Sequence, residues 1–103
     1  MRLLQDCFGK QVRLTVERMA HILEHPEMRS LGLEVERVLR EPALVRRSRT
    51  DPSVSLYYRF YEQTSLGGKW LCVVVKYGES DAFVVTAYLT DQPKAGEDLW
   101  VKK

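Results

Sequence analysis

Five arginines lie close together in one segment of the chain. From Arg37 to Arg49 the segment holds these five arginines and one acidic residue, Glu41, so its local net charge is +4. A guanidinium group suits phosphate because its planar fork can hold two oxygens at once. The segment therefore predicts a surface that attracts phosphates, and a solvated charged surface without a ligand is the alternative.

Two histidines lie four positions apart in the string His-Ile-Leu-Glu-His, residues 21–25. On a helix, His21 and His25 would share a face, where such pairs can chelate zinc or exchange protons near neutral pH. The chain is too short for a protease cleft, and His25 directly precedes Pro26, so we expect no metal site. His21 and His25 could instead act as acid/base groups, and two ordinary surface histidines are the alternative.

The elements that must position these groups can be predicted from periodicity. The N-terminal part predicts a hairpin with strands Leu3–Phe8 and Gln11–Leu14. A helix from Val16 to about His25 should follow. Further helical segments are expected between Pro26 and Pro42, interrupted at Gly32. From residue 43 the period changes to two, and short turns separate four strands. These predicted strands are Leu44–Arg49, Ser55–Glu62, Lys69–Tyr77 and Ala82–Thr90, and the tail from Asp91 to Lys103 is expected to be irregular with Trp100 holding it down.

The fold predicted from this pattern is a single α+β domain, residues 1–103. The N-terminal hairpin and two to three helices would pack on a four-stranded antiparallel β-meander. Alternation predicts that the apolar residues Leu56, Tyr58 and Phe60 face the helices. The open face would then carry tyrosines on which RNA bases could stack and cations that could bind RNA phosphates. The alternative is that the tyrosines merely reflect strand propensity. This predicted platform consists of Tyr57, Arg59, Tyr61, Lys76, Thr86 and Tyr88.

The remaining composition limits the class of protein only weakly. Sixteen basic and fourteen acidic residues give a net charge of +2, which by itself does not indicate nucleic acid. The two cysteines, Cys7 and Cys72, form neither a disulfide framework nor a CxxC zinc motif and suit a reducing cytoplasm. No signal peptide or membrane-spanning segment is expected, so we predict a cytoplasmic protein without a cofactor.

A series of short motifs in order resembles the phage-type nuclease domains of the barnase–EndoU–colicin–RelE superfamily. The motifs begin at Leu14-Thr15 and cover about nine-tenths of the chain. They include His21-Ile22, His25-Pro26-Glu27, Val45-Arg46-Arg47-Ser48-Arg49-Thr50-Asp51-Pro52, Leu56-Tyr57-Tyr58-Arg59, Val73-Val74-Val75-Lys76, Val85-Thr86-Ala87-Tyr88 and Lys94-Ala95-Gly96-Glu97-Asp98-Leu99-Trp100.

The resemblance implies a RelE- or barnase-like fold and a metal-independent endoribonuclease of the toxin type, acting on tRNA or mRNA in a phage or mobile-element setting. An antitoxin or immunity protein would be a partner, and the oligomeric state is left open. Cleavage needs a base for the 2′-OH, cations for the phosphorane oxygens and an acid for the leaving oxygen. The predicted catalytic residues are His21, Arg47, Arg59, Lys76, Thr86 and Tyr88, and the predicted substrate-binding residues are His25, Arg46, Arg49, Tyr57, Tyr61 and Lys94. A module of the same fold that binds RNA or a protein without cleavage is the alternative.

Overall fold

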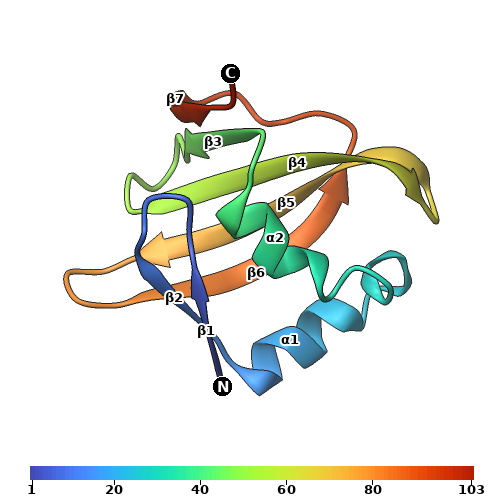
Figure 1. The fold of residues 1–103 in the computed structure, drawn as a ribbon, viewed down its shortest axis with the longest axis horizontal. Coiled ribbons are helices and arrows are strands. Elements are labelled where there is room, and N and C mark those ends of the chain that lie inside the picture. The colour runs from blue at the N-terminus through green and yellow to red at the C-terminus, as the bar shows by residue number, and fades with distance from the viewer.

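Seven strands form one sheet, and two short helices cover one of its faces (Figure 1). The computed structural model describes residues 1–103. The strands make up 47% of the chain, so the sheet rather than the helices dominates the fold. In chain order the elements are β1 (Arg2–Gln5), β2 (Gln11–Leu14), α1 (Val16–Leu23), the 3-10 turn η1 (Pro26–Met28), α2 (Glu34–Arg40), β3 (Leu44–Arg47), β4 (Val54–Thr64), β5 (Gly67–Tyr77), β6 (Ala82–Thr90) and β7 (Glu97–Val101).

The sheet has the strand order β1-β2-β6-β5-β4-β3-β7 and is mixed. Strands β3 to β6 form a meander of antiparallel neighbours. The β1–β2 hairpin joins this meander through a parallel pair, in which Arg13 of β2 lies opposite Phe83 of β6. At the other edge, β7 runs antiparallel to β3. Segments from both ends of the sequence therefore form the outer strands of the sheet.

The predicted fold class, a four-stranded meander under two to three helices, is wrong. The four central strands lie where the alternation placed them, but the hairpin and the segment Glu97–Val101 add three strands to the same sheet. The tail expected to be irregular thus contains β7. Edge strands have unpaired backbone N–H and C=O groups, and pairing satisfies those of β3 and β6. Such pairing between distant segments has no local sequence pattern, which is why periodicity did not predict it.

The helices are short and are stopped by identifiable residues. Helix α1 begins after Thr15, whose side-chain oxygen accepts a hydrogen bond of 3.1 Å from the backbone N–H of Arg18. Pro26 starts η1 rather than a further α-helix, and α2 begins only after Gly32. The helices contain eight and seven residues, and neither has the length and apolar character needed to cross a membrane.

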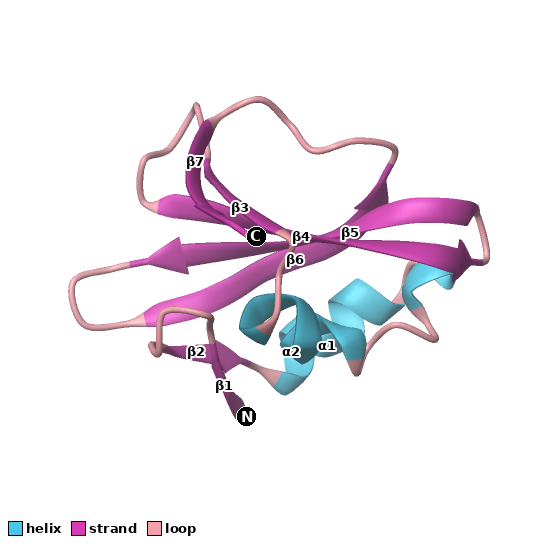
Figure 2. Cartoon of the chain, turned by 45° about the horizontal axis from the view of Figure 1, so that its top comes forward, coloured by secondary structure: helices cyan, strands magenta, loops and turns pink.

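The main hydrophobic core lies between the helices and the sheet (Figure 2). Helix α2 contributes Val35, Val38 and Leu39, which are fully buried. Tyr57 of β4 is fully buried in the same core. Because side chains alternate along a strand, its neighbours Leu56 and Tyr58 lie on the other face of the sheet. The face that the helices cover is therefore the one that carries Tyr57.

A buried carboxylate connects the hairpin to the centre of the sheet. Asp6 is 3% exposed, and its Oδ1 accepts hydrogen bonds of 2.9 Å from the backbone N–H groups of Phe8 and Lys10. Its Oδ2 accepts hydrogen bonds from the hydroxyls of Tyr57, at 3.3 Å, and Tyr77, at 2.7 Å. The two tyrosine hydroxyls also lie within hydrogen-bond distance of each other, so their two protons serve three contacts. One carboxylate thus fixes the turn after β1 and the inward direction of two tyrosines.

We predict that Asp6→Ala lowers the free energy of unfolding by about 2–4 kcal/mol, because it leaves buried donors without their acceptor. Urea unfolding followed by circular dichroism measures the change. Asp6→Asn, which keeps the shape of the side chain, serves if the alanine variant does not fold. Asp91→Asn is the matched control, because the side chain of Asp91 is largely exposed and its ion pair with Lys69 lies at the surface. Equal stability of the Asp6 and Asp91 variants would contradict the role of the Asp6 network.

Candidate functional site

The face of the sheet opposite the helices carries a second, smaller apolar cluster. Leu56 and Tyr58 of β4 and Cys72 of β5 form its buried part. The segment between β6 and β7 arches over this side of the sheet (Figure 2). The backbone N–H of Lys94, in that segment, donates a hydrogen bond of 3.1 Å to the hydroxyl of Tyr58. We call this side the open face, because no helix covers it.

A cleft of about 540 Å³ lies on the open face beside this cluster. Its volume is in the range of about 300–1,000 Å³ that is typical of ligand sites. The floor comes from β4, β5 and β6, and the walls come from the β3–β4 turn and the segment after β6. The polar residues that line it are Ser48, Arg49, Thr50, Thr86, Tyr88 and Lys94.

Two of the cleft's lining residues are cations without an acidic partner. Arg49 is exposed, and neither Arg49 nor the ammonium group of Lys94 forms an ion pair. The Lys94 ammonium lies 5.8 Å from the centre of the Tyr88 ring, which is a cation–π distance. An unpaired cation can bind an anion without first breaking an ion pair. The cleft is therefore suited to phosphate.

The other cations of β3 and β5 are already paired, with Arg46 and Lys76 on the open face and Arg47 on the helix side of the sheet. Arg46 Nε donates to Asp98 Oδ1 at 2.7 Å, and Arg47 Nη1 lies 3.3 Å from Glu97 Oε1, so strand β7 neutralises both arginines. Lys76 Nζ donates to Asp51 Oδ2 at 2.7 Å. The local net charge of the arginine-rich segment is thus largely cancelled by residues elsewhere in the sequence.

Two tyrosine hydroxyls and one thiol at the cleft have raised pKa values. Burial raises the pKa of Tyr88, and the neighbouring Cys72 raises it further. Burial likewise raises the pKa of Tyr58 to about 12 and that of the Cys72 thiol to about 11. At neutral pH these groups can donate hydrogen bonds or a proton, but they cannot serve as bases.

The carboxylate of Asp51 follows the cleft-lining residue Thr50 in the chain but is not itself part of the cleft lining. The hydrogen bond from Lys76, followed by those from Ser53, lowers the pKa of Asp51 from 3.8 to about 2. The side chain of Asp51 is 40% exposed. Asp51 is therefore an anion that fixes Lys76 and the β3–β4 turn, and it is a weak base.

The structure divides the predicted RNA platform between the two faces of the sheet. Thr86, Tyr88 and Lys76 lie on the open face, because they pair with or follow Val74 and Cys72 in register. Tyr57 and Tyr61 lie on the helix face instead. Burial raises the pKa of both tyrosines, and the hydroxyl of Tyr61 donates to Glu34 Oε1 at 2.6 Å. The expectation that all these residues share one open face is wrong.

Arg59 and the histidines also lie away from the cleft. Arg59 Nη1 donates to the backbone carbonyl of Glu41 at 2.6 Å, next to the end of α2. His21 lies on α1, with Nδ1 at 3.4 Å from Glu24 Oε2. His25 Nδ1 lies 3.8 Å from Glu27 Oε1 at the start of η1. The helices cover the opposite face, so the structure does not bring either histidine together with Thr86 and Tyr88. No group of three or more His, Cys, Asp or Glu side chains lies close enough together to hold a metal ion.

Four predicted site residues do line one cleft: Arg49, Thr86, Tyr88 and Lys94. Sequence reasoning missed Ser48 and Thr50, whose hydroxyls lie 3.1 Å apart in the β3–β4 turn. The position of these hydroxyls directly beside Arg49 was the available signal, since hydroxyls next to a cation are common ligands of phosphate.

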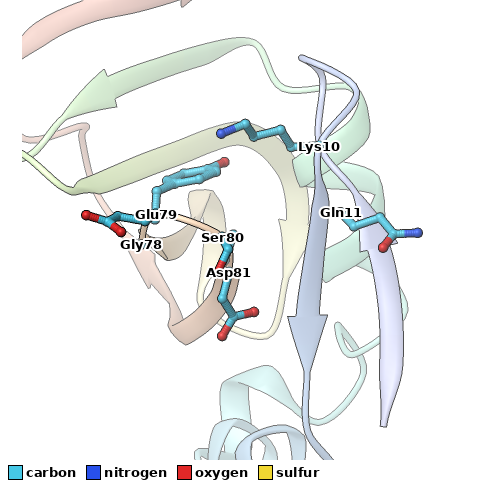
Figure 3. A pocket seen from close by; sticks show the side chains of 8 residues that line it. Lys10, Gln11, Gly78, Glu79, Ser80 and Asp81 are labelled. Carbon is cyan, nitrogen blue, oxygen red and sulfur yellow. The ribbon is translucent and has the colours of Figure 1, made fainter.

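Another hollow, of about 350 Å³, lies between the turns of the two hairpins β1–β2 and β5–β6 (Figure 3). Lys10 and the Gly78–Asp81 turn line it, and the Lys10 ammonium lies 5.8 Å from the centre of the Tyr77 ring. The turn supplies two acidic residues, Glu79 and Asp81, so this hollow is less suited to an anion than the open-face cleft.

Comparisons with known proteins give no further assignment. No protein-family model, no curated protein and no solved structure matches the chain. The resemblance to phage-type nuclease domains therefore stays a prediction from the sequence.

We predict that Asp51 makes the free energy of unfolding depend on pH in the acid range. Its pKa in the folded state lies below the unfolded value, so this contribution is complete above the unfolded pKa of 3.8 and is lost as the pH falls through about 2. Asp51→Asn should destabilise the protein at neutral pH, and the difference from the wild type should shrink over that acid range. Urea unfolding at a series of pH values measures it, and Lys76→Gln should weaken the same dependence. A difference that is independent of pH would contradict this account.

Proposed function

We propose that the protein is a metal-independent endoribonuclease whose site is the open-face cleft. The observation that supports this most is the convergence of Arg49, Lys94, Thr86 and Tyr88 on one cleft from two segments that are distant in sequence, the β3–β4 turn and the stretch from β6 to Lys94. Two unpaired cations beside several hydroxyls are the groups that an RNA phosphate requires. The resemblance of the sequence to nuclease domains, which named Thr86 and Tyr88 as site residues, points to the same activity, although the fold that it implied is not the one found.

Each group has a separate role in this proposal. Arg49 and Lys94 bind the scissile phosphate and stabilise the charge that develops on its oxygens. The Thr86 hydroxyl orients the phosphate by a hydrogen bond. Tyr88 keeps its proton because of its raised pKa, so it can protonate the leaving 5′-oxygen. Asp51, held by Lys76, is the carboxylate that can accept the 2′-OH proton, and its low pKa makes the reaction slow at neutral pH.

The weak basicity of Asp51 favours a second candidate function. With both histidines on the other face, the cleft contains no side chain whose pKa suits a general base near neutral pH. A protein that binds single-stranded RNA in the cleft without cutting it needs only the cations, the hydroxyls and the Tyr88 ring. This candidate requires the same site and differs only in the absence of cleavage.

We predict that the double variant Arg49→Ala, Lys94→Ala cleaves RNA about 100-fold more slowly than the wild type, because both phosphate-binding cations are lost. The assay uses labelled tRNA and mRNA in excess EDTA, and the products are examined for 2′,3′-cyclic phosphate ends. His21→Ala should retain the wild-type rate, because His21 lies on the helix face.

Arg40→Gln on α2 is the control for a lost cation away from the cleft, and thermal unfolding of each variant establishes that it is folded. Cleavage that survives the double substitution but is abolished by His21→Ala would move the site to the helices. Salt-dependent RNA binding without cleavage by the wild type would establish the second candidate instead.

A further inference from the structure

The base of the open-face cleft is apolar, whereas its rim is polar. Val54 and Leu56 of β4 and Val74 of β5 form this base, which we call the apolar floor. All three side chains lie on the open face, because Leu56 pairs with Val74 and Val54 precedes Leu56 by two residues. Val54 and Val74 are only half-buried, so water contacts apolar surface inside the cleft. A ligand that covers this surface gains the free energy of removing it from water.

The ring of Tyr88 borders the apolar floor. Tyr88 follows the cleft residue Thr86 by two positions on β6, so both side chains lie on the open face. The Tyr88 side chain is half-buried, and the Lys94 ammonium lies 5.8 Å from the centre of its ring. The unpaired Arg49 lies on the wall formed by the β3–β4 turn. The cleft thus combines apolar surface at its base with two cations at its rim.

This combination matches a nucleotide better than it matches a phosphate ion. Inorganic phosphate has no apolar surface to place on the apolar floor. A nucleotide has a base with flat faces as well as a phosphate, so it can use the floor and the rim together. A base that is paired within a duplex has its faces stacked on its neighbours and must leave the stack to reach a protein surface. The lining of the cleft therefore favours an unpaired nucleotide.

Both walls of the cleft are held in place by hydrogen bonds to the backbone. In the segment after β6, the N–H of Lys94 donates to the Tyr58 hydroxyl at 3.1 Å, and the C=O of Lys94 accepts from Arg46 Nη1 at 2.8 Å. In the β3–β4 turn, the N–H of Ser48 donates to the C=O of Val54 at 2.9 Å. These bonds are present without a ligand, so binding does not have to order either wall.

We infer that the cleft binds one unpaired RNA nucleotide, whose base lies on the apolar floor and whose phosphate is held at the rim by Arg49 and Lys94. The base is held through its faces rather than its edges, which makes the site tolerant of sequence. The inference rests on the proposed function and adds to it the unit that is recognised, a nucleotide of a single-stranded segment.

The test is a calorimetric titration with ligands that carry the base, the phosphate or both. The probes are uridine 5′-monophosphate, ribose 5-phosphate, uridine and inorganic phosphate, and none of them contains a phosphodiester that could be cleaved. We predict that uridine 5′-monophosphate binds at least about tenfold more tightly than any of the other three, because it alone uses the floor and the rim together.

A second titration tests the requirement for an unpaired base. A 2′-O-methyl oligouridine, in which the methylated 2′ position prevents cleavage, is compared with its duplex with 2′-O-methyl oligoadenosine at the same ionic strength. The single strand should bind at least about tenfold more tightly, although the duplex carries more phosphates, because the bases of the duplex remain stacked.

Variants separate the apolar floor from the rim. Val74→Ser should weaken uridine 5′-monophosphate about fivefold and leave ribose 5-phosphate unchanged, because it removes only apolar surface. Val54→Ser serves if this variant does not fold. Val16→Ser is the matched control, because Val16 is 68% exposed on α1, away from the cleft. Lys94→Ala should weaken uridine 5′-monophosphate and ribose 5-phosphate alike.

The outcomes distinguish the base position from the function on which it rests. Equal affinity for uridine 5′-monophosphate and ribose 5-phosphate, with both weakened by Lys94→Ala, would overturn the base position and leave the cleft as a phosphate site. An effect of Val74→Ser no larger than that of Val16→Ser, or equal binding of single strand and duplex, would likewise overturn it. No binding of any ligand by folded protein would overturn both the base position and the proposed function.

Discussion

The arrangement of both faces of the sheet depends on the buried carboxylate of Asp6. It accepts hydrogen bonds from two backbone N–H groups and from the hydroxyls of Tyr57 and Tyr77. An isolated carboxylate would be costly to bury, and these donors replace the water that it loses. Because Tyr57 must face Asp6, strict alternation places Leu56 and Tyr58 on the opposite face. The Asp6 network and the main core together therefore set which side chains of β4 face the helices.

The open-face cleft follows from that direction. With Tyr58 on the open face, its hydroxyl accepts a hydrogen bond from the backbone of Lys94 and holds the segment after β6 against the sheet. The same segment leads into β7, whose Glu97 and Asp98 neutralise Arg47 and Arg46. The cleft that remains contains the cations which β7 leaves unpaired. Position and charge at the site are therefore set by the interactions that hold the sheet together.

Sequence reasoning located what depends on neighbouring residues and failed where partners are distant. The four central strands follow from local alternation and overlap the predicted ranges, although β3 ends at Arg47 rather than Arg49. The faces of β4 were reversed because Leu56, Tyr58 and Phe60 were taken as the set that packs on the helices, whereas Tyr57 is buried there and has its partner Asp6 in another hairpin. Arg49, Thr86, Tyr88 and Lys94, which line the cleft, could be named as candidate site residues from the sequence. The pairing of Arg46 with Asp98 could not, because it depends on a strand that no periodicity indicated.

The parallel junction between β2 and β6 has a consequence for assembly in solution. The hairpin meets the meander at one register pair, reinforced by the ion pair between Arg13 and Asp81, residues that are 68 positions apart. Contacts between such distant segments form late in folding, after the local meander. Until then, the edge of β6 is open to the hairpin of any chain. At high concentration, two chains can exchange their hairpins, and the resulting domain-swapped dimer contains the same pairings as two monomers.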